Sequence, residues 1–312
     1  MKPLLAKNWV EAKQVFPCGA QPKIDGVRGL TTEGGLTGRS LKKHKNKYTT
    51  AFYSTPEYAF LDGELAAGPE TSQDLCNVTS TALRTIQGEP FTLWHLFDCL
   101  HKHVIQGPYI ERYNYLAQKI AHEQAHGRMM HARLMPMQIC KSMEELLYWD
   151  TLWLEMGYEG TCIRNLNALH KEGRSGILTG ELLRIKRFID AEAVVLELEE
   201  GTRNDNEAQI NELGRTFRTS HQENKVPNGV VGNMQCKMLA DVEYNGEIIL
   251  RKDQIVTVSP GAMDHEKRRH YWLNPGELVG HVIKFKFFPK GIKEKPRFPT
   301  YQAHRNSADM SE

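Results

Sequence analysis

The chain has few of the features that are typical of secreted, membrane-spanning or zinc-stabilised proteins. Its six cysteines lie scattered over 312 residues, at positions 18, 76, 99, 140, 162 and 236, and none form a C-x-x-C pair. A disulfide framework and a zinc site are therefore not expected, and we interpret all six cysteines as structural. No apolar run approaches the roughly eighteen residues of a membrane span, and the N-terminus MKPLLAKNWVEAK lacks a signal-peptide core. We expect no membrane partner and a cytoplasmic or nuclear location.

The chain also carries almost no net charge, because 40 Lys and Arg nearly cancel 38 Asp and Glu to leave +2. The basic residues are nevertheless clustered. The segment 37–47, TGRSLKKHKNK, has no acid, 267–269 is KRR, and 284–297, KFKFFPKGIKEKPR, interleaves lysines with phenylalanines. A solvated basic face explains any one cluster, but three together favour a polyphosphate partner such as nucleic acid.

Two helices are predicted in the first part of the chain. Pro108 suits a first helical turn, apolar residues follow at helical spacing up to Ile120, and Gly127 marks the end. A second helix is predicted over 142–157, where Ser142 and Glu145 form a capping box. Both helices are expected to be scaffold.

Strands dominate after residue 188. The segment 191–200, AEAVVLELEE, predicts a strand, 242–250, VEYNGEIIL, predicts an Asn-Gly hairpin, and 278–288, LVGHVIKFKFF, alternates apolar with basic residues. Since 312 residues exceed what one core usually organises, we expect an α+β chain with two domains, 1–188 and 189–312. The second domain fits a small β-barrel such as an OB-fold.

The polar segment 201–229, GTRNDNEAQINELGRTFRTSHQENKVPNG, is too long for an ordinary connection. Arg215 and Arg218 belong to its basic residues, which suit contact with a phosphate backbone. A loose surface insertion explains the segment equally well, so both interpretations remain open.

The segment 21–29, QPKIDGVRG, places Lys23 before an Asp-Gly turn, with Arg28 five residues later. A neutral lysine amine can attack phosphorus, provided that cations elsewhere neutralise the phosphate. The turn would bring Lys23 and Arg28 toward one phosphate, and the carboxylate of Asp25 could orient the lysine.

Further motifs follow in a fixed order. They are G-R-S at 38–40, L-D-G-E-L at 61–65, L-F-D at 96–98, Y-E-G-x-x-I-R at 158–164 and L-R-I-K-R-F at 183–188. With K-x-D-G-x-R at 23–28, this series resembles the signature of the covalent nucleotidyltransferases: ATP-dependent DNA ligases, RNA ligases and mRNA capping enzymes. The similarity is greatest to the minimal viral DNA ligases of the Chlorella virus type, and it spans nearly the whole chain.

This resemblance implies a fold and a reaction. An adenylation (nucleotidyltransferase) domain of antiparallel sheets and helices would precede an OB-fold domain. Lys23 would attack the α-phosphorus of ATP to give a lysyl-AMP, the AMP would move to the 5′-phosphate of a nick in duplex DNA, and the 3′-hydroxyl would displace it. ATP and Mg²⁺ are the implied cofactors.

The resemblance also implies roles for individual residues. Catalytic roles fall to Lys23, Arg28, Arg184, Lys186 and Arg297. Arg184 and Lys186, spaced two apart on a strand, would face the α-phosphate, and Arg297 would help to expel pyrophosphate. Arginine stands at 184 where many relatives have lysine.

The remaining roles concern the nucleotide and the metal. Besides these cations, the nucleotide would contact Arg39, Glu64 at its ribose, Phe97 stacked on adenine and Gln21 at the base edge, where relatives vary. Glu64 and Glu159 would hold the metal, with Asp62 a less certain carboxylate. Considered alone, Phe97 suits a core as well as a ligand contact.

DNA contacts are expected from Arg39, Lys42, Lys43, Arg215, Arg218, Lys284 and Lys286. Larger ligases of this group carry an extra N-terminal DNA-binding domain, for which the position of Lys23 leaves no room. We therefore expect a monomer that encircles DNA by itself, with segment 201–229 as a clamp.

Three alternatives stay open. An RNA ligase would share the lysine motif, a capping guanylyltransferase would use GTP, and a non-catalytic DNA-binding protein would keep only the basic clusters. The presence of Lys23, Glu64, Glu159 and Lys186 together argues against the last of these.

Overall fold

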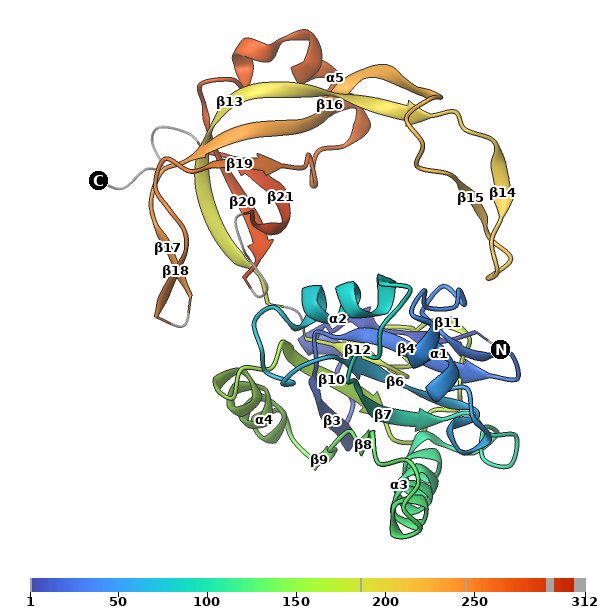
Figure 1. Cartoon of the computed structure of the whole chain (residues 1–312). Helices are drawn as coiled ribbons and strands as arrows, with labels where there is room; N and C mark the ends of the chain where they lie inside the picture. Colours follow the sequence, from blue (N-terminus) through green and yellow to red (C-terminus); the bar gives the residue numbers. More distant parts are fainter. Residues whose placement is uncertain (1, 186, 245, 290–294, 306–312) are drawn as a thin grey trace. The chain divides into compact units, whose positions relative to one another are not determined.

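The computed structural model describes residues 2–185, 187–244, 246–289 and 295–305 (Figure 1). The chain divides into two compact units, Met1–Lys186 and Arg187–Glu312, which are treated separately below. Within the described residues, no helix has the length and apolar character needed to cross a membrane.

The first unit combines short strands with four α-helices (Figure 1). Its strands are β1 (Leu4–Leu5), β2 (Lys7–Asn8), β3 (Cys18–Lys23), β4 (Val27–Thr32), β5 (Gly35–Thr37), β6 (Leu61–Ala66), β7 (Leu93–Cys99), β8 (Ala132–Leu134), β9 (Gln138–Cys140), β10 (Gly160–Asn165), β11 (Gly173–Arg174) and β12 (Leu183–Arg184). Its helices are η1 (Glu11–Lys13), α1 (Lys47–Phe52), η2 (Pro56–Tyr58), α2 (Leu75–Arg84), α3 (Tyr109–Ala125) and α4 (Met143–Glu155).

Two five-stranded sheets form the frame of this unit. One has the order β2-β12-β10-β3-β9 and the other β5-β4-β6-β7-β8, while β1 pairs with β11 in a separate parallel pair. Helix α4 covers the first sheet through Leu146 and Trp153, and α3 packs on the second through Leu116 and Ile120. Because β3 runs through a turn directly into β4, the end of β3 lies where one sheet passes into the other.

Both predicted helices are confirmed, with small differences at their ends. In α3, Pro108 is the residue before the first turn, and Gly127 adopts a left-handed φ of +72° after the helix. In α4, the Ser142 hydroxyl accepts from Glu145 N at 3.2 Å, but the Glu145 carboxylate accepts from Lys141 N instead of completing the capping box on Ser142.

The second unit is mostly β-structure. Its elements are β13 (Ile189–Asn204), β14 (Ala208–Ile210), β15 (Thr216–Arg218), β16 (Lys225–Met238), β17 (Val242–Tyr244), β18 (Glu247–Leu250), β19 (Ile255–Val258), α5 (His265–Leu273), η3 (Pro275–Glu277), β20 (Val282–Phe288) and β21 (Arg297–His304). The main sheet has the order β19-β16-β13-β20-β21 and is antiparallel throughout. Its ladders do not close into a barrel within the described residues, although Ser259 and Thr300 form an isolated bridge beside its two edge strands.

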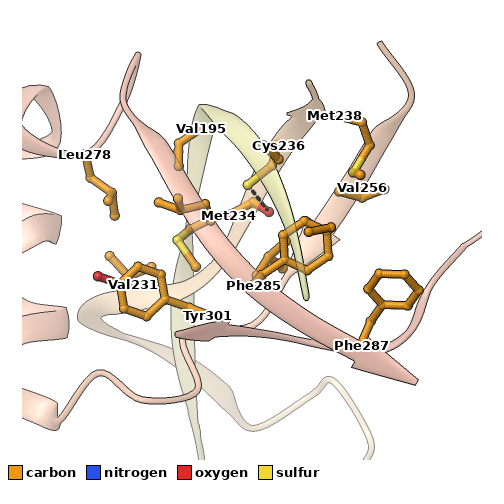
Figure 2. Packing of buried hydrophobic residues seen from close by; sticks show 14 of the residues in the cluster. Val195, Val231, Met234, Cys236, Met238, Val256, Leu278, Phe285, Phe287 and Tyr301 are labelled. Atoms are coloured by element: carbon orange, nitrogen blue, oxygen red, sulfur yellow. Dashed lines mark hydrogen bonds between the residues drawn. The ribbon is translucent and has the colours of Figure 1, made fainter. Parts of the chain in front are cut away.

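The core of this unit follows from strand alternation. Ile283, Phe285 and Phe287 on β20 are fully buried. Figure 2 shows Phe285 beside Cys236, with Phe287 farther along, near the end of β20. Lys284 and Lys286 alternate with them and are half-exposed, as the sequence predicts. The strands predicted over 191–200 and 278–288 are confirmed, although the second begins only at Val282. The hairpin predicted over 242–250 is confirmed as well, with Asn245 itself outside the described residues. The expected α+β class is therefore correct.

The segment 201–229 is more ordered than a loose insertion. Within this segment the last residues of β13 pair with the first residues of β16, with Thr202 opposite Pro227 and Asn204 opposite Lys225. Beyond them β14 and β15 form a hairpin, visible at the tip of the long β13–β16 ribbon in Figure 1. The segment is thus an arm of β-structure, which we call the β14–β15 arm (residues 201–229).

Candidate active site

The turn between β3 and β4 fixes the first group of predicted site residues. Lys23 ends β3, and Arg28 lies at the second position of β4, opposite Glu64 on β6. Gly26 occupies the turn where a side chain would not fit, since a Cβ there would lie 2.3 Å from Leu65 O and 2.9 Å from Glu64 Cγ. The glycine of K-x-D-G therefore lets the turn pass directly over the L-D-G-E-L strand.

A cavity of about 450 Å³ opens beside this turn, a size that suits a nucleotide. Its lining includes seven of the eight residues that the sequence assigned to the nucleotide: Gln21, Lys23, Arg28, Arg39, Glu64, Phe97 and Arg184. Arg164 and Arg174 bring the lining cations to six, against a single carboxylate, Glu64. Such a lining favours a ligand with several negative charges.

Lys23 is held by the carboxylate of Glu159, the residue directly before β10. Its ammonium donates to Glu159, and Glu159 N donates back to Lys23 O at 2.9 Å. Burial alone would lower the pKa of Lys23, but the neighbouring carboxylates, above all Glu159, outweigh it and raise the pKa above its ordinary value. The motifs at 23–28 and 158–164 thus meet in space, and Lys23 rests in its protonated form.

At Glu64, burial outweighs the neighbouring charges. Burial raises its pKa to about 7, and the attraction of Lys23 and Arg28 only partly offsets this. Glu159 lies near enough to raise the Glu64 pKa further. Two neighbouring carboxylates beside a cavity rich in cations fit a hard divalent cation, which would take its other ligands from water and from an anionic ligand. No group of three or more candidate ligands occurs among the described residues.

Arg28 is fixed on three sides. Its Nη2 donates to Asp62 Oδ2 at 2.6 Å and to Leu4 O at 3.1 Å, and its Nε donates to Asp62 Oδ1. The guanidinium also lies 4.8 Å from the centre of the Phe97 ring. Asp62, the less certain carboxylate of the sequence prediction, therefore positions Arg28, and Phe97 faces the cavity as well as packing on a small core cluster.

Behind the cavity lies a buried polar network that the sequence prediction did not assign. Arg112 forms a two-point ion pair with Asp98, at 2.8 and 3.1 Å, and Tyr109 OH bonds Phe97 O at 2.8 Å. Arg164 lies 4.5 Å from the Tyr109 ring centre and 3.4 Å from Gln21 Oε1. Arg164 was detectable in sequence, because it ends the Y-E-G-x-x-I-R motif and alternates by two with Cys162, which also lines the cavity.

The remaining predicted residues are distributed as follows. Arg184 lines the cavity and donates to Asn8 Oδ1 at 3.0 Å, but β12 ends at Arg184, and Lys186 lies outside the described residues. Arg39, Lys42 and Lys43 are exposed after β5. The structure therefore does not test the predicted pairing of Arg184 with Lys186.

The other predicted residues belong to the second unit. Arg297 begins β21 with its guanidinium 5.4 Å from the Phe288 ring centre, and Lys284 pairs with Asp190 at 2.7 Å. Lys286 lies 5.2 Å from the Phe188 ring centre. Arg215 and Arg218 are exposed on the β14–β15 arm, where Arg218 donates to Asn206 O.

A second cavity of about 490 Å³ in the first unit is lined by Lys13, Lys171, His170 and Glu181 among others. It is slightly larger, but it contains none of the predicted site residues and only two of its lining residues are Lys or Arg. The predicted residues and the basic lining therefore favour the cavity beside Lys23 as the candidate active site.

Comparisons with known proteins identify the fold. No protein-family model matches the chain, and no curated protein sequence matches it significantly. Two crystal structures of Chlorella virus DNA ligase-adenylate are 24% and 25% identical to it, cover 98% and 99% of this chain and 99% of their own, and give TM-scores of 0.52 and 0.51. A structure of a Lig E DNA ligase, described as binding DNA with a minimal scaffold, is 20% identical to this chain. It covers 98% of this chain and 99% of its own, with a TM-score of 0.69. The resemblance in sequence is thus confirmed as a likeness of fold: a nucleotidyltransferase unit and an OB-fold unit.

Proposed function

We propose that this chain is an ATP-dependent DNA ligase that seals nicks carrying a 5′-phosphate and a 3′-hydroxyl. The observation that carries the proposal is the cavity beside Lys23, in which one paired lysine faces five arginines and an aromatic ring. Positioning and charge neutralisation are what an in-line displacement at phosphorus requires. The fold shared with DNA ligases supports DNA as the acceptor.

The first step uses the neutral amine of Lys23. It attacks the α-phosphorus of ATP, a nitrogen–phosphorus bond forms, and the bond to the bridging oxygen breaks so that pyrophosphate leaves. The protonated Lys23 must lose its proton to solvent before attack, which requires that its ion pair with Glu159 be broken. Arg184, Arg39 and Arg28 neutralise the phosphate oxygens, with Lys186 as a further candidate.

The two later steps move the AMP. The 5′-phosphate oxygen at the nick attacks the phosphorus of lysyl-AMP and releases Lys23, and the 3′-hydroxyl then attacks the 5′-phosphate and releases AMP. Arg28, held by Asp62 and Leu4 O, is pre-positioned to bind a phosphate with its remaining donors. We assign Arg297 to the departure of pyrophosphate in the first step.

Glu64 and Glu159 are the residues that would hold Mg²⁺, and the ion would supply positive charge at the phosphates. We further propose that residues 1–188 act as the adenylation domain and 189–312 as an OB-fold domain. The β14–β15 arm would clamp duplex DNA around a monomeric enzyme, with Arg215, Arg218, Lys284, Lys286, Lys42 and Lys43 on phosphates.

The test is covalent labelling of the purified protein with ATP or GTP carrying ³²P at the α-phosphate. Labelling by ATP that is lost in Lys23→Ala and kept in the control Lys13→Ala supports the proposal. Labelling by GTP with no labelling by ATP would favour a capping guanylyltransferase, and transfer of the label to nicked RNA alone would favour an RNA ligase. A protein that takes up no label fits the non-catalytic alternative.

A further inference from the structure

Gln21 carries an unused hydrogen-bond donor inside the cavity. The residue is only 2% exposed and lines the cavity beside Lys23. Its Nε2 is buried and has no hydrogen-bond partner within the part of the chain that the structure describes. A buried donor without a partner costs about 1–3 kcal/mol, so its position calls for a ligand that accepts.

The orientation of this amide is set by Arg164. Gln21 Oε1 lies 3.4 Å from Arg164 Nε and 3.1 Å from Tyr109 OH. A guanidinium has donors only, so the amide oxygen must face Arg164 whichever way the Tyr109 hydroxyl turns. Arg164 is itself buried and stacks near Tyr109 and Phe97, at 4.5 and 5.1 Å from their ring centres. The NH₂ end of Gln21 is thereby left unpaired.

The same donor lies near the base end of a nucleotide attacked by Lys23. Gln21 and Lys23 are two residues apart on β3, so their side chains share one face, about 7 Å apart along the strand. Apolar side chains suited to a base also line the cavity, Phe97 and Met135 among them, whereas the phosphates need Lys23 and the arginines. Gln21 therefore belongs to the part of the cavity that reads the base.

We propose that Gln21 offers the base a donor only, so that this subsite admits 6-oxopurines as well as adenine. This rests on the proposed nucleotidyl transfer. Adenine presents ring nitrogens as acceptors beside its 6-amino donor, and hypoxanthine presents its 6-oxo oxygen as an acceptor. One donor fits either base, and the amide oxygen that could have read the 6-amino group is committed to Arg164.

The test compares the rate of Lys23 labelling with ATP and with ITP, which lacks the 2-amino group of GTP. For the wild-type protein we expect the two rates to differ by no more than about tenfold. Gln21→Glu keeps the shape but offers only acceptors, so it should slow ITP far more than ATP and raise the preference for ATP to at least about a hundredfold. Gln21→Met removes the donor and should slow both nucleotides by a similar factor of about ten.

Three results would overturn the inference: a wild-type preference for ATP above about a hundredfold, an unchanged preference in Gln21→Glu, or a loss in Gln21→Met confined to one nucleotide. Thermal unfolding of each variant establishes whether it is folded. If Gln21→Glu does not fold, the effect of Gln21→Met on the two labelling rates tests the inference alone. A wild-type protein labelled by neither nucleotide contradicts the proposed function itself, which separates the two failures.

Discussion

At the scale of single residues, the cavity favours the charged form of Lys23 and the neutral form of Glu64. Lys23 is kept charged by Glu159, while burial keeps Glu64 on the border of ionisation near neutral pH. Substrate phosphates and a divalent cation would change both balances, since each adds charge next to these groups. The site therefore holds Lys23 as a cation, and in the proposed reaction the binding of ATP and Mg²⁺ would have to favour the neutral amine.

Glu64 gives a pH-dependent prediction. Its folded-state pKa of about 7 lies above the unfolded value of about 4.3, so its contribution to stability is fully present below the unfolded pKa and is lost as pH rises through 7. Glu64→Gln should therefore raise the free energy of unfolding by about 2 kcal/mol at pH 8 and by almost nothing at pH 4. Urea unfolding at the two pH values measures this, and an equal effect at both would contradict the assigned pKa.

Asp62 gives a prediction about the anchor of Arg28. Removing its charge leaves a largely buried guanidinium without its carboxylate, so Asp62→Asn should lower the free energy of unfolding by about 3 kcal/mol. Asp205→Asn is the matched control. It breaks the ion pair between Arg203 and Asp205, which has a similar two-point geometry but is exposed to solvent. Chemical denaturation should show no change for the control. Equal effects in the two variants would show that burial of the Arg28 pair has no energetic importance.

At the scale of elements, regular patterns were predictable and contacts between distant segments were not. Helices α3 and α4 and strand β20 follow from apolar spacing and caps, because these signals are local. The motif order also selected seven residues that line one cavity. The sequence could not reveal that Arg164 fixes Gln21, since that contact joins residues 143 apart through the pairing of β3 with β10. It also did not reveal that segment 201–229 pairs with itself, because its strands are short and polar.

The β14–β15 arm gives a prediction at this scale. If the arm holds DNA, Arg215→Ala with Arg218→Ala should weaken binding to a nicked duplex by about tenfold or more and leave Lys23 labelling unchanged. Glu207→Ala on the same arm removes an acid instead and should not weaken binding. Gel-shift titration with a sealed and a nicked duplex separates the outcomes. Unaltered affinity in the double variant would remove the arm from the DNA-binding surface.

At the scale of the whole molecule, the net charge of +2 conceals an uneven distribution. Basic residues concentrate around the Lys23 cavity in the first unit and along β20 and α5 in the second, whereas the four Lys and Arg of the β14–β15 arm are balanced by four Asp and Glu. A protein that binds DNA with such local clusters gains affinity mainly by neutralising phosphates and releasing counterions.

Salt dependence tests this distribution. Nick binding should weaken by at least about a hundredfold between 50 and 200 mM salt, because six or so phosphate contacts give a steep slope. Measuring the affinity for a nicked duplex by fluorescence anisotropy across this range gives the slope directly. A flat response would mean that apolar or base contacts, and not the basic clusters, hold the DNA.

The central claim is tested most directly by sealing of a 5′-phosphorylated nick in duplex DNA with ATP and Mg²⁺, comparing wild type with Lys23→Ala and Lys13→Ala. The account predicts sealing by wild type and Lys13→Ala, none by Lys23→Ala, and none on a nick with a 5′-hydroxyl. Sealing by Lys23→Ala, or a wild-type protein that leaves the phosphorylated nick open while its Lys23 takes up AMP, would contradict a DNA ligase acting through Lys23.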